Sequence, residues 1–318
     1  MTKALITGLS GMDASHLADF LLEKNYEVFG TIRRHANSDS EWGNSSHLKD
    51  KIKSYYVDLC DAHSIHLAIK DCKPDEIYLL AAQSHVGISS DIANYTMNVN
   101  ATGTLNCLEE IRQTSPNSKV YFAGTSELFG NCIDEDGFQR ETTKMEPVSP
   151  YAVSKLAAYQ MCQHYKNAYN IFVSVGVLFN HCSSRRGISF VTQKIVRGAV
   201  SIKKGEASEL RLGNLESSRD DGDARDYVRG MWMMLQHNKP DNFVLATGKT
   251  RTIREFTDIV FSKLGLNYKD YIIQDEKFMR PQELHTLKGD ATKAKNLLGW
   301  KPEITFEQMI DDMIGAAL

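Results

Sequence analysis

The sequence predicts an α/β fold: a doubly wound parallel sheet with a smaller C-terminal α/β unit. In the first half, apolar runs of strand length alternate with stretches whose apolar residues recur at helical spacing, a pattern typical of parallel sheets covered by helices. The second half loses this alternation after about residue 175. We therefore expect residues 1–175 to form the first domain, with a strand near 242–246 returning to it, and residues 176–318 to form most of the second.

Each element is placed by its own local pattern. Between residues 15 and 24, for example, Leu17, Ala18, Leu21 and Leu22 recur at helical spacing. Strands are expected at 4–7, 27–32, 54–57, 76–81, 119–124, 171–178 and 242–246. Helices are expected at 15–24, 103–112, 151–168, 253–264 and from residue 306. Residues 183–222, rich in Arg, Ser, Gly and Asp, are interpreted as loops and a small cap with short helical pieces.

Composition excludes several classes of protein. The formal net charge of -3 lacks the basic excess typical of nucleic-acid binding. No apolar run approaches the ~18 residues of a membrane span, and the first strand begins too early for a signal peptide. The six cysteines are scattered and form no C-x-x-C pair. We expect a cytoplasmic protein with free thiols, no metal site, no nucleic-acid partner and no membrane association.

A glycine turn after the first strand predicts a dinucleotide site of the Rossmann type. Gly8 and Gly11 permit a tight turn and close approach of a pyrophosphate, which the N-terminus of the next helix attracts. An NAD site usually places an acid roughly 20 residues further on. Here Arg33 and Arg34 end the second strand, with no acid until Asp39, which favours the 2′-phosphate of NADP. The alternatives are a plain strand–helix turn and a solvated arginine pair.

Two groups of residues predict the chemistry. Tyr151 and Lys155 lie four residues apart, on one face of a helix. A nearby ammonium stabilises a phenolate, so that Tyr151 could take a proton from a sugar hydroxyl while a hydride passes to nicotinamide. Thr125, Ser126 and Glu127 follow the fifth strand, where ligands bind in such sheets. Simple oxidation needs no carboxylate, whereas elimination of water needs an acid/base group, which Glu127 could supply. The alternative for Glu127 is a loop or helix-capping role.

The sequence resembles the extended short-chain dehydrogenase/reductase family and, within it, the GDP-mannose 4,6-dehydratases. The resemblance covers nearly the whole chain. The segments that carry it are 7–13, Arg33-Arg34, 81–86, 125–130, 149–151, 179–181, 185–187, 190–192, 213–215, and Arg280-Pro281 with Glu283.

The resemblance implies an NADP-dependent cycle on a GDP-linked sugar. Tyr151, aided by Lys155 and Thr125, would oxidise C4, Glu127 with Ser126 would eliminate water across C5 and C6, and the hydride would return to C6. The residues expected to contact the cofactor are Thr7, Gly8, Ser10, Gly11, Met12, Asp13, Arg33, Arg34, Asp58, Leu59, Leu80, Ala81, Ala82, Ser84, Tyr151, Lys155 and Arg186. Those expected to contact the substrate are Ser84, Thr125, Glu127, Asn180, Val191, Lys194, Gly213, Arg219, Arg280 and Glu283.

In such relatives the Arg185-Arg186 loop reaches a neighbouring subunit, so the resemblance also implies a homo-oligomer, either a tetramer or a dimer. The chain departs from the family pattern at Ala14, where a Gly is usual, and in a shorter stretch before Arg280. It also has Asp221-Gly222-Asp223 where Trp-Gly-His is usual. These departures leave open whether the sugar is GDP-mannose or GDP-manno-heptose. An NADP-linked nucleotide-sugar reductase or epimerase, and a non-enzymatic NADP sensor, remain alternatives.

Overall fold

The computed structural model of the chain describes residues 1–36, 40–279 and 282–318. Its centre is a seven-stranded, wholly parallel sheet in the order β10-β6-β5-β4-β1-β2-β3, so the Rossmann-type prediction is confirmed. The strands are β1 (Lys3–Ile6), β2 (Glu27–Ile32), β3 (Lys53–Tyr56), β4 (Glu76–Leu79), β5 (Lys119–Ala123), β6 (Val173–Leu178) and β10 (Asn242–Leu245).

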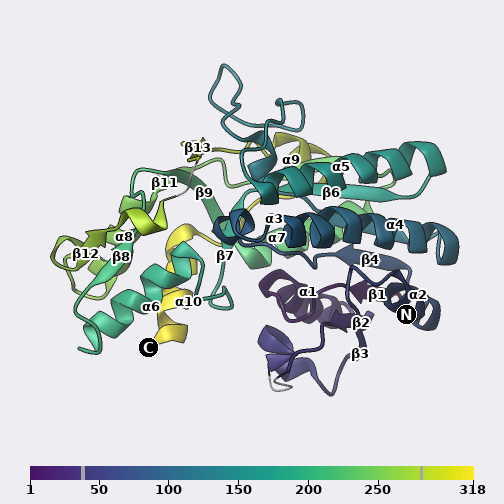
Figure 1. Cartoon of the computed structure of the whole chain (residues 1–318), viewed down its shortest axis with the longest axis horizontal. Helices are drawn as coiled ribbons and strands as arrows, with labels where there is room; N and C mark the ends of the chain where they lie inside the picture. Colours follow the sequence, from purple (N-terminus) through teal and green to yellow (C-terminus); the bar gives the residue numbers. More distant parts are fainter. Residues whose placement is uncertain (37–39, 280–281) are drawn as a thin grey trace.

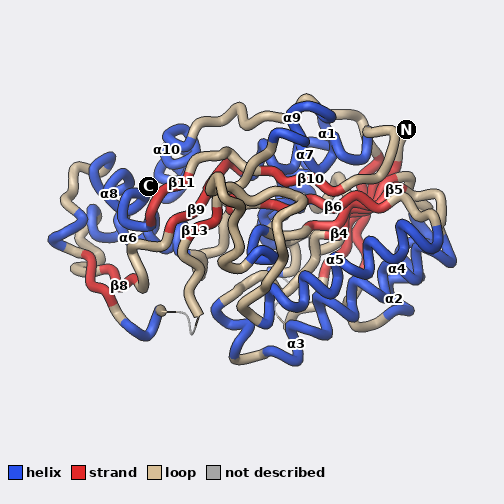
Figure 2. The backbone as a smooth tube through the Cα atoms, turned by 90° about the horizontal axis from the view of Figure 1, so that it is seen from above, coloured by secondary structure: helices blue, strands red, loops and turns tan. Residues whose placement is uncertain are grey.

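Helices cover both faces of this sheet (Figure 2). On one face, α1 (Met12–Glu23), α7 (Ala224–Gln236) and α9 (Thr292–Leu298) share one apolar core with the strands. On the other face, α2 (Ala62–Cys72), α4 (Gly103–Thr114) and α5 (Pro150–Tyr169) share a second core. Late segments of the chain thus complete the first domain: β10 adds the last strand to the sheet, and α7 and α9 help to cover one face.

A third core lies at the end of the molecule that holds the C-terminus (Figure 1). It is built from α6 (Val191–Lys203), α8 (Ile253–Lys263) and α10 (Phe306–Ala317), beside the short pair β8 (Leu210–Leu212) and β12 (Ile272–Gln274). A small sheet joins this core to the main one. Its strands are β7 (Asn180–Cys182), β9 (Ser218–Asp223), β11 (Thr250–Thr252) and β13 (Thr286–Leu287).

The interpretation of residues 183–222 as loops with short helical pieces was wrong in part. The segment contains the 13-residue helix α6 and the six-residue strand β9. Polar residues dilute the average hydrophobicity of α6, but its buried face carries Ile195, Val196, Ala199 and Val200 at helical spacing. Among the described residues, no helix is long and apolar enough to span a membrane.

Trp300 anchors α7 and α9 to each other. Its side chain is fully buried, its Nε1 donates to the Asp226 carbonyl oxygen at 2.8 Å, and a Cβ added at Gly230 would lie 2.9 Å from Nε1. We predict that Trp300→Ala lowers the free energy of unfolding by about 3–5 kcal/mol, because it leaves a cavity and an unpaired carbonyl.

Denaturant unfolding measures this loss. Leu297→Ala, at a side chain that is 51% exposed on the preceding turn, is the control and should change stability by less than about 0.5 kcal/mol. Equal effects of the two substitutions would contradict the anchoring role of Trp300.

Candidate active site

The site lies where the chain order of the sheet reverses, between β1 and β4. Gly8 ends β1 with a φ of +73°, and a Cβ there would lie 2.9 Å from the Ala81 Cα. Gly11 is the N-cap of α1 and has no side chain that could cap the helix, so the first N–H groups of α1 are available to an anion. The predicted pyrophosphate cradle of Gly8, Ser10, Gly11 and Met12 therefore has suitable geometry, although Met12 itself is largely buried.

Thr7 has a structural role. Its hydroxyl oxygen accepts hydrogen bonds from the backbone N–H groups of Leu80 and Ala81, at 2.9 and 3.0 Å. The hydroxyl itself donates to the Tyr78 carbonyl oxygen. Thr7 thus fixes the end of β4 against β1, and it holds Leu80 and Ala81 in place.

The two arginines predicted to bind the 2′-phosphate are exposed, and each already contacts another side chain. Arg33 donates to the Tyr95 hydroxyl at 2.5 Å, and Arg34 forms an ion pair of 2.7 Å with Glu41. Glu41 is 4% exposed and also accepts from the Tyr56 hydroxyl. Sequence reasoning missed Glu41, because a contact between side chains seven residues apart outside a helix has no local sequence signature. Asp39, the acid noted in the sequence, lies outside the described residues.

The two residues predicted to follow β3 differ in their surroundings. Asp58 is exposed and accepts from the Cys60 backbone N–H within its own turn. The Leu59 side chain belongs to the sheet core, where a Cβ on Gly103 would lie 2.7 Å from its Cβ. The expected contact of Leu59 with the cofactor stays a prediction.

A cavity of about 870 Å³ opens at the carboxyl ends of the strands. It brings together residues from the cofactor, catalytic and substrate groups. The predicted residues that line it are Asp13, Leu80, Ala82, Ser84, Thr125, Glu127, Tyr151, Lys155, Asn180, Arg186, Val191, Lys194 and Gly213.

Tyr151 and Lys155 enter this cavity from the first turns of α5. The helix begins there because the Ser149 hydroxyl accepts from the Ala152 N–H and Pro150 occupies the first turn. Lys155 donates to the Ala123 carbonyl oxygen at 2.9 Å, and burial lowers its pKa to about 8. Burial raises the pKa of Tyr151 to about 12; the Thr125 hydroxyl partly offsets this, and the Glu127 carboxylate adds to it.

This pKa direction differs from the sequence expectation. An ammonium beside the phenol was expected to favour the phenolate, but here Lys155 is directed to the Ala123 carbonyl oxygen and burial dominates. Tyr151 is therefore a neutral hydrogen-bonding group until further positive charge enters the cavity.

Of the three residues after β5, two line the cavity. Thr125 caps the short 3₁₀ turn Ser126–Phe129 by accepting from the Glu127 N–H. Ser126 is 1% exposed and is not among the residues that line the cavity. Glu127 is buried at the cavity wall. The capping group of this turn is thus Thr125.

Asn100 holds the loop after β4 and was missed by sequence reasoning. It lies in a π-helical turn, Asn98–Thr102, between α3 (Ala93–Met97) and α4. Its side chain accepts from the Gln83 N–H at 2.8 Å and donates to the Gln83 carbonyl oxygen and the Ser154 hydroxyl. The loop that carries Ser84 is thereby fixed to α5.

A ladder of contacts joins α1 to the segment after β6. His181 Nε2 lies 3.0 Å from Asp13 Oδ2, His16 Nε2 lies 2.9 Å from Ser183 Oγ, and Arg185 pairs with Asp19 at 2.7 Å. Burial disfavours charge on Asp13 and His181, but their mutual attraction prevails: the pKa of Asp13 is lowered and the pKa of His181 is raised.

Arg186 follows this ladder and points into the same chain's cavity. Its guanidinium lies 3.7 Å from the centre of the Phe190 ring, and both residues line the cavity. Within one chain, Arg185 thus contacts α1 and Arg186 faces the site. The expected reach of this loop to a neighbouring subunit stays a prediction.

The far end of the cavity is formed by residues beside the third core. Lys194 Nζ lies 3.5 Å from the centre of the Phe278 ring, and burial lowers the pKa of Lys194. Gly213 is needed because a Cβ there would lie 2.4 Å from the Phe278 carbonyl oxygen. Lys277 and Phe278, which line this end, were not predicted from the sequence.

Two residues that were predicted to contact the substrate do not line the cavity. Arg219 is 5% exposed and donates to the carbonyl oxygens of Ser218 and Leu284. Glu283 accepts from the Ser217 hydroxyl at 3.3 Å. Neither is among the residues that line the cavity. Arg280 and Pro281 lie outside the described residues.

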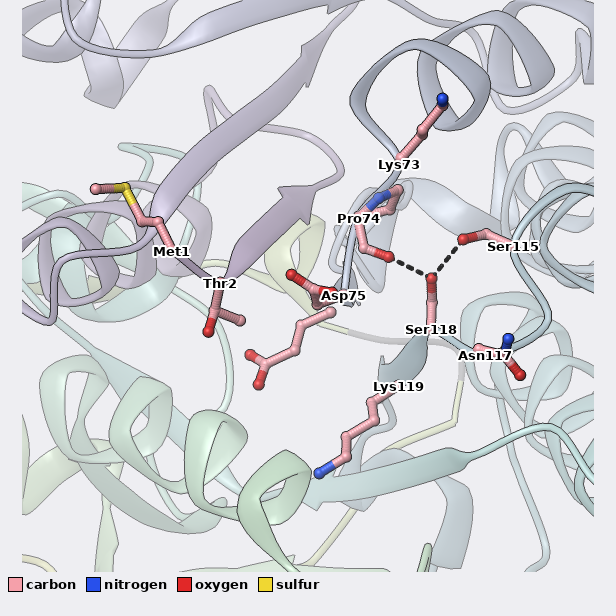
Figure 3. Close-up of a pocket in the computed structure, with 10 residues that line it drawn as sticks. Met1, Thr2, Lys73, Pro74, Asp75, Ser115, Asn117, Ser118 and Lys119 are labelled. Atoms are coloured by element: carbon pink, nitrogen blue, oxygen red, sulfur yellow. Dashed lines mark hydrogen bonds between the residues drawn. The ribbon is translucent and has the colours of Figure 1, made fainter.

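A second groove, of about 690 Å³, lies at the opposite edge of the sheet (Figure 3). It is lined by residues around the amino ends of β1, β4 and β5, where the Ser118 hydroxyl donates to the Pro74 carbonyl oxygen and contacts the Ser115 hydroxyl. Ligands of open parallel sheets bind at the carboxyl edge instead. This groove therefore has no part in the candidate site.

Comparisons with known proteins agree with this geometry. The family model described as GDP-mannose 4,6 dehydratase matches residues 5–313. The chain belongs to the GDP-mannose 4,6-dehydratase family. It is 48% identical to GDP-mannose 4,6 dehydratase 2 of Arabidopsis thaliana, over 98% of this chain and 85% of that protein. It is 41% identical to the human GDP-mannose 4,6 dehydratase, over 98% of this chain and 90% of that protein.

Solved structures share the fold at lower identity. RMD from Pseudomonas aeruginosa, complexed with NADPH, superposes with a TM-score of 0.82 at 24% identity, covering 100% of this chain and 99% of that chain. A Thermotoga maritima UDP-glucose 4-epimerase with UDP-glucose superposes with a TM-score of 0.87 at 22% identity, covering 99% and 98%. Both likenesses establish the extended dehydrogenase/reductase fold of this family member.

The lowered pKa of Lys155 predicts a pH-dependent stability. Because the folded pKa of about 8 lies below the usual 10.5, the unfolded chain binds more protons between these values. The wild type should therefore gain stability, relative to Lys155→Met, as pH rises from about 8 towards 10.5.

Melting temperatures of both proteins across this range test the prediction. Lys166→Met, on the same helix, is the control and should show no such trend. A constant difference between wild type and Lys155→Met would contradict a buried, titrating ammonium.

Proposed function

We propose that the protein is an NADP-dependent GDP-sugar 4,6-dehydratase that forms a 4-keto-6-deoxy sugar. One observation carries the proposal: in a chain of the GDP-mannose 4,6-dehydratase family, Tyr151, Thr125 and the Glu127 carboxylate line one cavity at the carboxyl edge of the sheet. We further propose that residues 1–175, with the returning β10, form the NADP-binding domain and that residues 176–318 mainly bind the nucleotide sugar.

The cofactor site fits NADP by its own geometry. Gly8 leaves room for close approach, the first turn of α1 offers N–H groups to the pyrophosphate, and the exposed Arg33 and Arg34 suit a 2′-phosphate. When bound, the oxidised nicotinamide supplies a hydride acceptor and a positive charge. That charge, together with Lys155, favours the phenolate of Tyr151, whose pKa burial raises to about 12.

The residues then divide the reaction between them. Thr125 hydrogen-bonds the C4 hydroxyl while Tyr151 takes its proton, so that C4 becomes a ketone as its hydride leaves. Glu127 removes the C5 proton, which the new ketone acidifies, and returns a proton to the departing C6 hydroxyl, which leaves as water. The hydride then adds to C6 and Tyr151 supplies the proton for C5, so no cofactor is consumed. Ser126 has no direct part, because it lies outside the cavity lining.

A reductase or epimerase would use Tyr151 and Lys155 without a carboxylate at position 127. The buried Glu127 beside Thr125 therefore favours elimination. The substrate is GDP-mannose or GDP-manno-heptose, since either sugar carries the C4, C5 and C6 groups that the reaction needs. We also propose a cytoplasmic homo-oligomer.

We predict that the purified protein, supplied with NADP and GDP-mannose or GDP-manno-heptose, removes one water from the sugar without net formation of NADPH. Mass spectrometry of the product follows the loss of water, and the faster substrate identifies the sugar. A product of unchanged mass would instead support the epimerase, and net formation of reduced cofactor would support the reductase acting in reverse.

Substitutions at the two proton-transfer residues should separate the steps. Tyr151→Phe should lower kcat by about 10²–10⁴-fold, since it removes the acid/base group of oxidation. Glu127→Gln should still oxidise C4 once, so the absorbance of reduced nicotinamide appears in a single turnover and persists without loss of water.

Glu135→Gln, at an exposed glutamate, is the control and should retain wild-type turnover. Normal elimination by Glu127→Gln would refute the role of this carboxylate.

A further inference from the structure

Strand β9 carries three aspartates, at positions 220, 221 and 223, and two of them are fully engaged. Asp220 is completely buried and accepts from the Thr247 N–H, the Thr247 hydroxyl and the Gly248 N–H, at 2.7–2.8 Å. Asp223 is the N-cap of α7 and accepts from the Arg225 N–H, Nε and Nη2, at 2.7–2.9 Å. Both carboxylates therefore have structural roles.

Asp221 differs from its neighbours. It is 7% exposed and lines the active-site cavity, yet it makes no hydrogen bond or ion pair with any described residue. It lies opposite Asn180 in the pairing of β9 with β7, beside the Asp13–His181 contact. A carboxylate that is nine-tenths buried and lacks a hydrogen-bond donor is costly, which indicates that a donor arrives from a ligand.

The surroundings keep this carboxyl able to accept hydrogen bonds. Burial raises the pKa of Asp221, while the nearby positive charges of Arg219, Arg186, His181 and Arg251 act against this rise. Arg186 acts electrostatically on both Asp221 and Tyr151. Because Asp221 pairs with Asn180, and the next residue, His181, contacts Asp13 on α1, Asp221 lies on the side of the cavity next to α1.

We infer that Asp221 is a specificity-determining residue whose carboxylate accepts hydrogen bonds from the C2 and C3 hydroxyls of the sugar. The inference rests on the proposed function and identifies what the site recognises. In that reaction C1 carries the diphosphate, C4 is oxidised and C6 loses its hydroxyl, so C2 and C3 carry the ring hydroxyls that stay intact. The two oxygens of a carboxylate suit a pair of adjacent hydroxyls, whereas they would repel the diphosphate.

Calorimetric binding to the NADPH-loaded protein tests this, because reduced cofactor permits no turnover. Asp221→Leu should weaken GDP-mannose binding by about 10- to 100-fold, the effect of losing hydrogen bonds to a charged group. Asp221→Asn should weaken it less. For GDP-2-deoxymannose and for GDP-3-deoxymannose, the difference between wild type and Asp221→Leu should shrink to about 3- to 10-fold, because one of the two donors is already missing.

Asp223→Asn is the matched control, since Asn also caps helices well; it should bind all three sugars as the wild type does. Equal weakening of all three sugars by Asp221→Leu, or weaker NADPH binding with unchanged sugar binding, would overturn the inference. Asp221→Asn provides the measurement if Asp221→Leu misfolds. Absence of dehydration with the expected binding pattern would overturn the proposed function alone.

Discussion

The ladder between α1 and the segment after β6 is the contact on which the site depends. Asp13 and His181 form its central rung, flanked by His16 with Ser183 and by Asp19 with Arg185. The α1 partners recur every three residues, so all three face one side of the helix. Because α1 begins at the pyrophosphate cradle and the segment after β6 leads into the third core, this ladder fixes the two walls of the cavity relative to each other. Each member of its central pair favours the charged form of the other: the pKa of Asp13 is lowered and that of His181 is raised.

In the cavity between these walls, the pKa values of the reactive side chains are set by burial more than by fixed charge pairs. Burial raises the pKa of Tyr151 and lowers that of Lys155, so the ligand-free site disfavours the charged forms of both. A site of this kind becomes reactive when bound cofactor brings positive charge, which links proton removal to hydride acceptance. The same logic applies to Asp221, whose carboxylate lacks a donor until a sugar hydroxyl arrives.

The sequence predicted most of the sheet because each strand and glycine turn has a local signature. Gly8, for example, is required because its φ is positive and the approach of the Ala81 backbone leaves no room for a side chain. Contacts made by tertiary structure were not predictable in this way. Glu41 meets Arg34 through a returning loop, and Leu59 turns into the core although its neighbour Asp58 is exposed. Asp221 and Asp223 show the limit most clearly: they are identical residues two apart, yet one caps a helix and the other faces the cavity.

Internal hydride transfer is the central claim, and deuterium placement tests it most directly. GDP-mannose labelled with deuterium at C4 would be converted by the protein with NADP in ordinary water, and the product examined by NMR. The account predicts that the deuterium is found at C6 of a 4-keto-6-deoxy sugar, with a solvent proton at C5. Deuterium retained at C4, or lost to a stoichiometric pool of reduced cofactor, would contradict it.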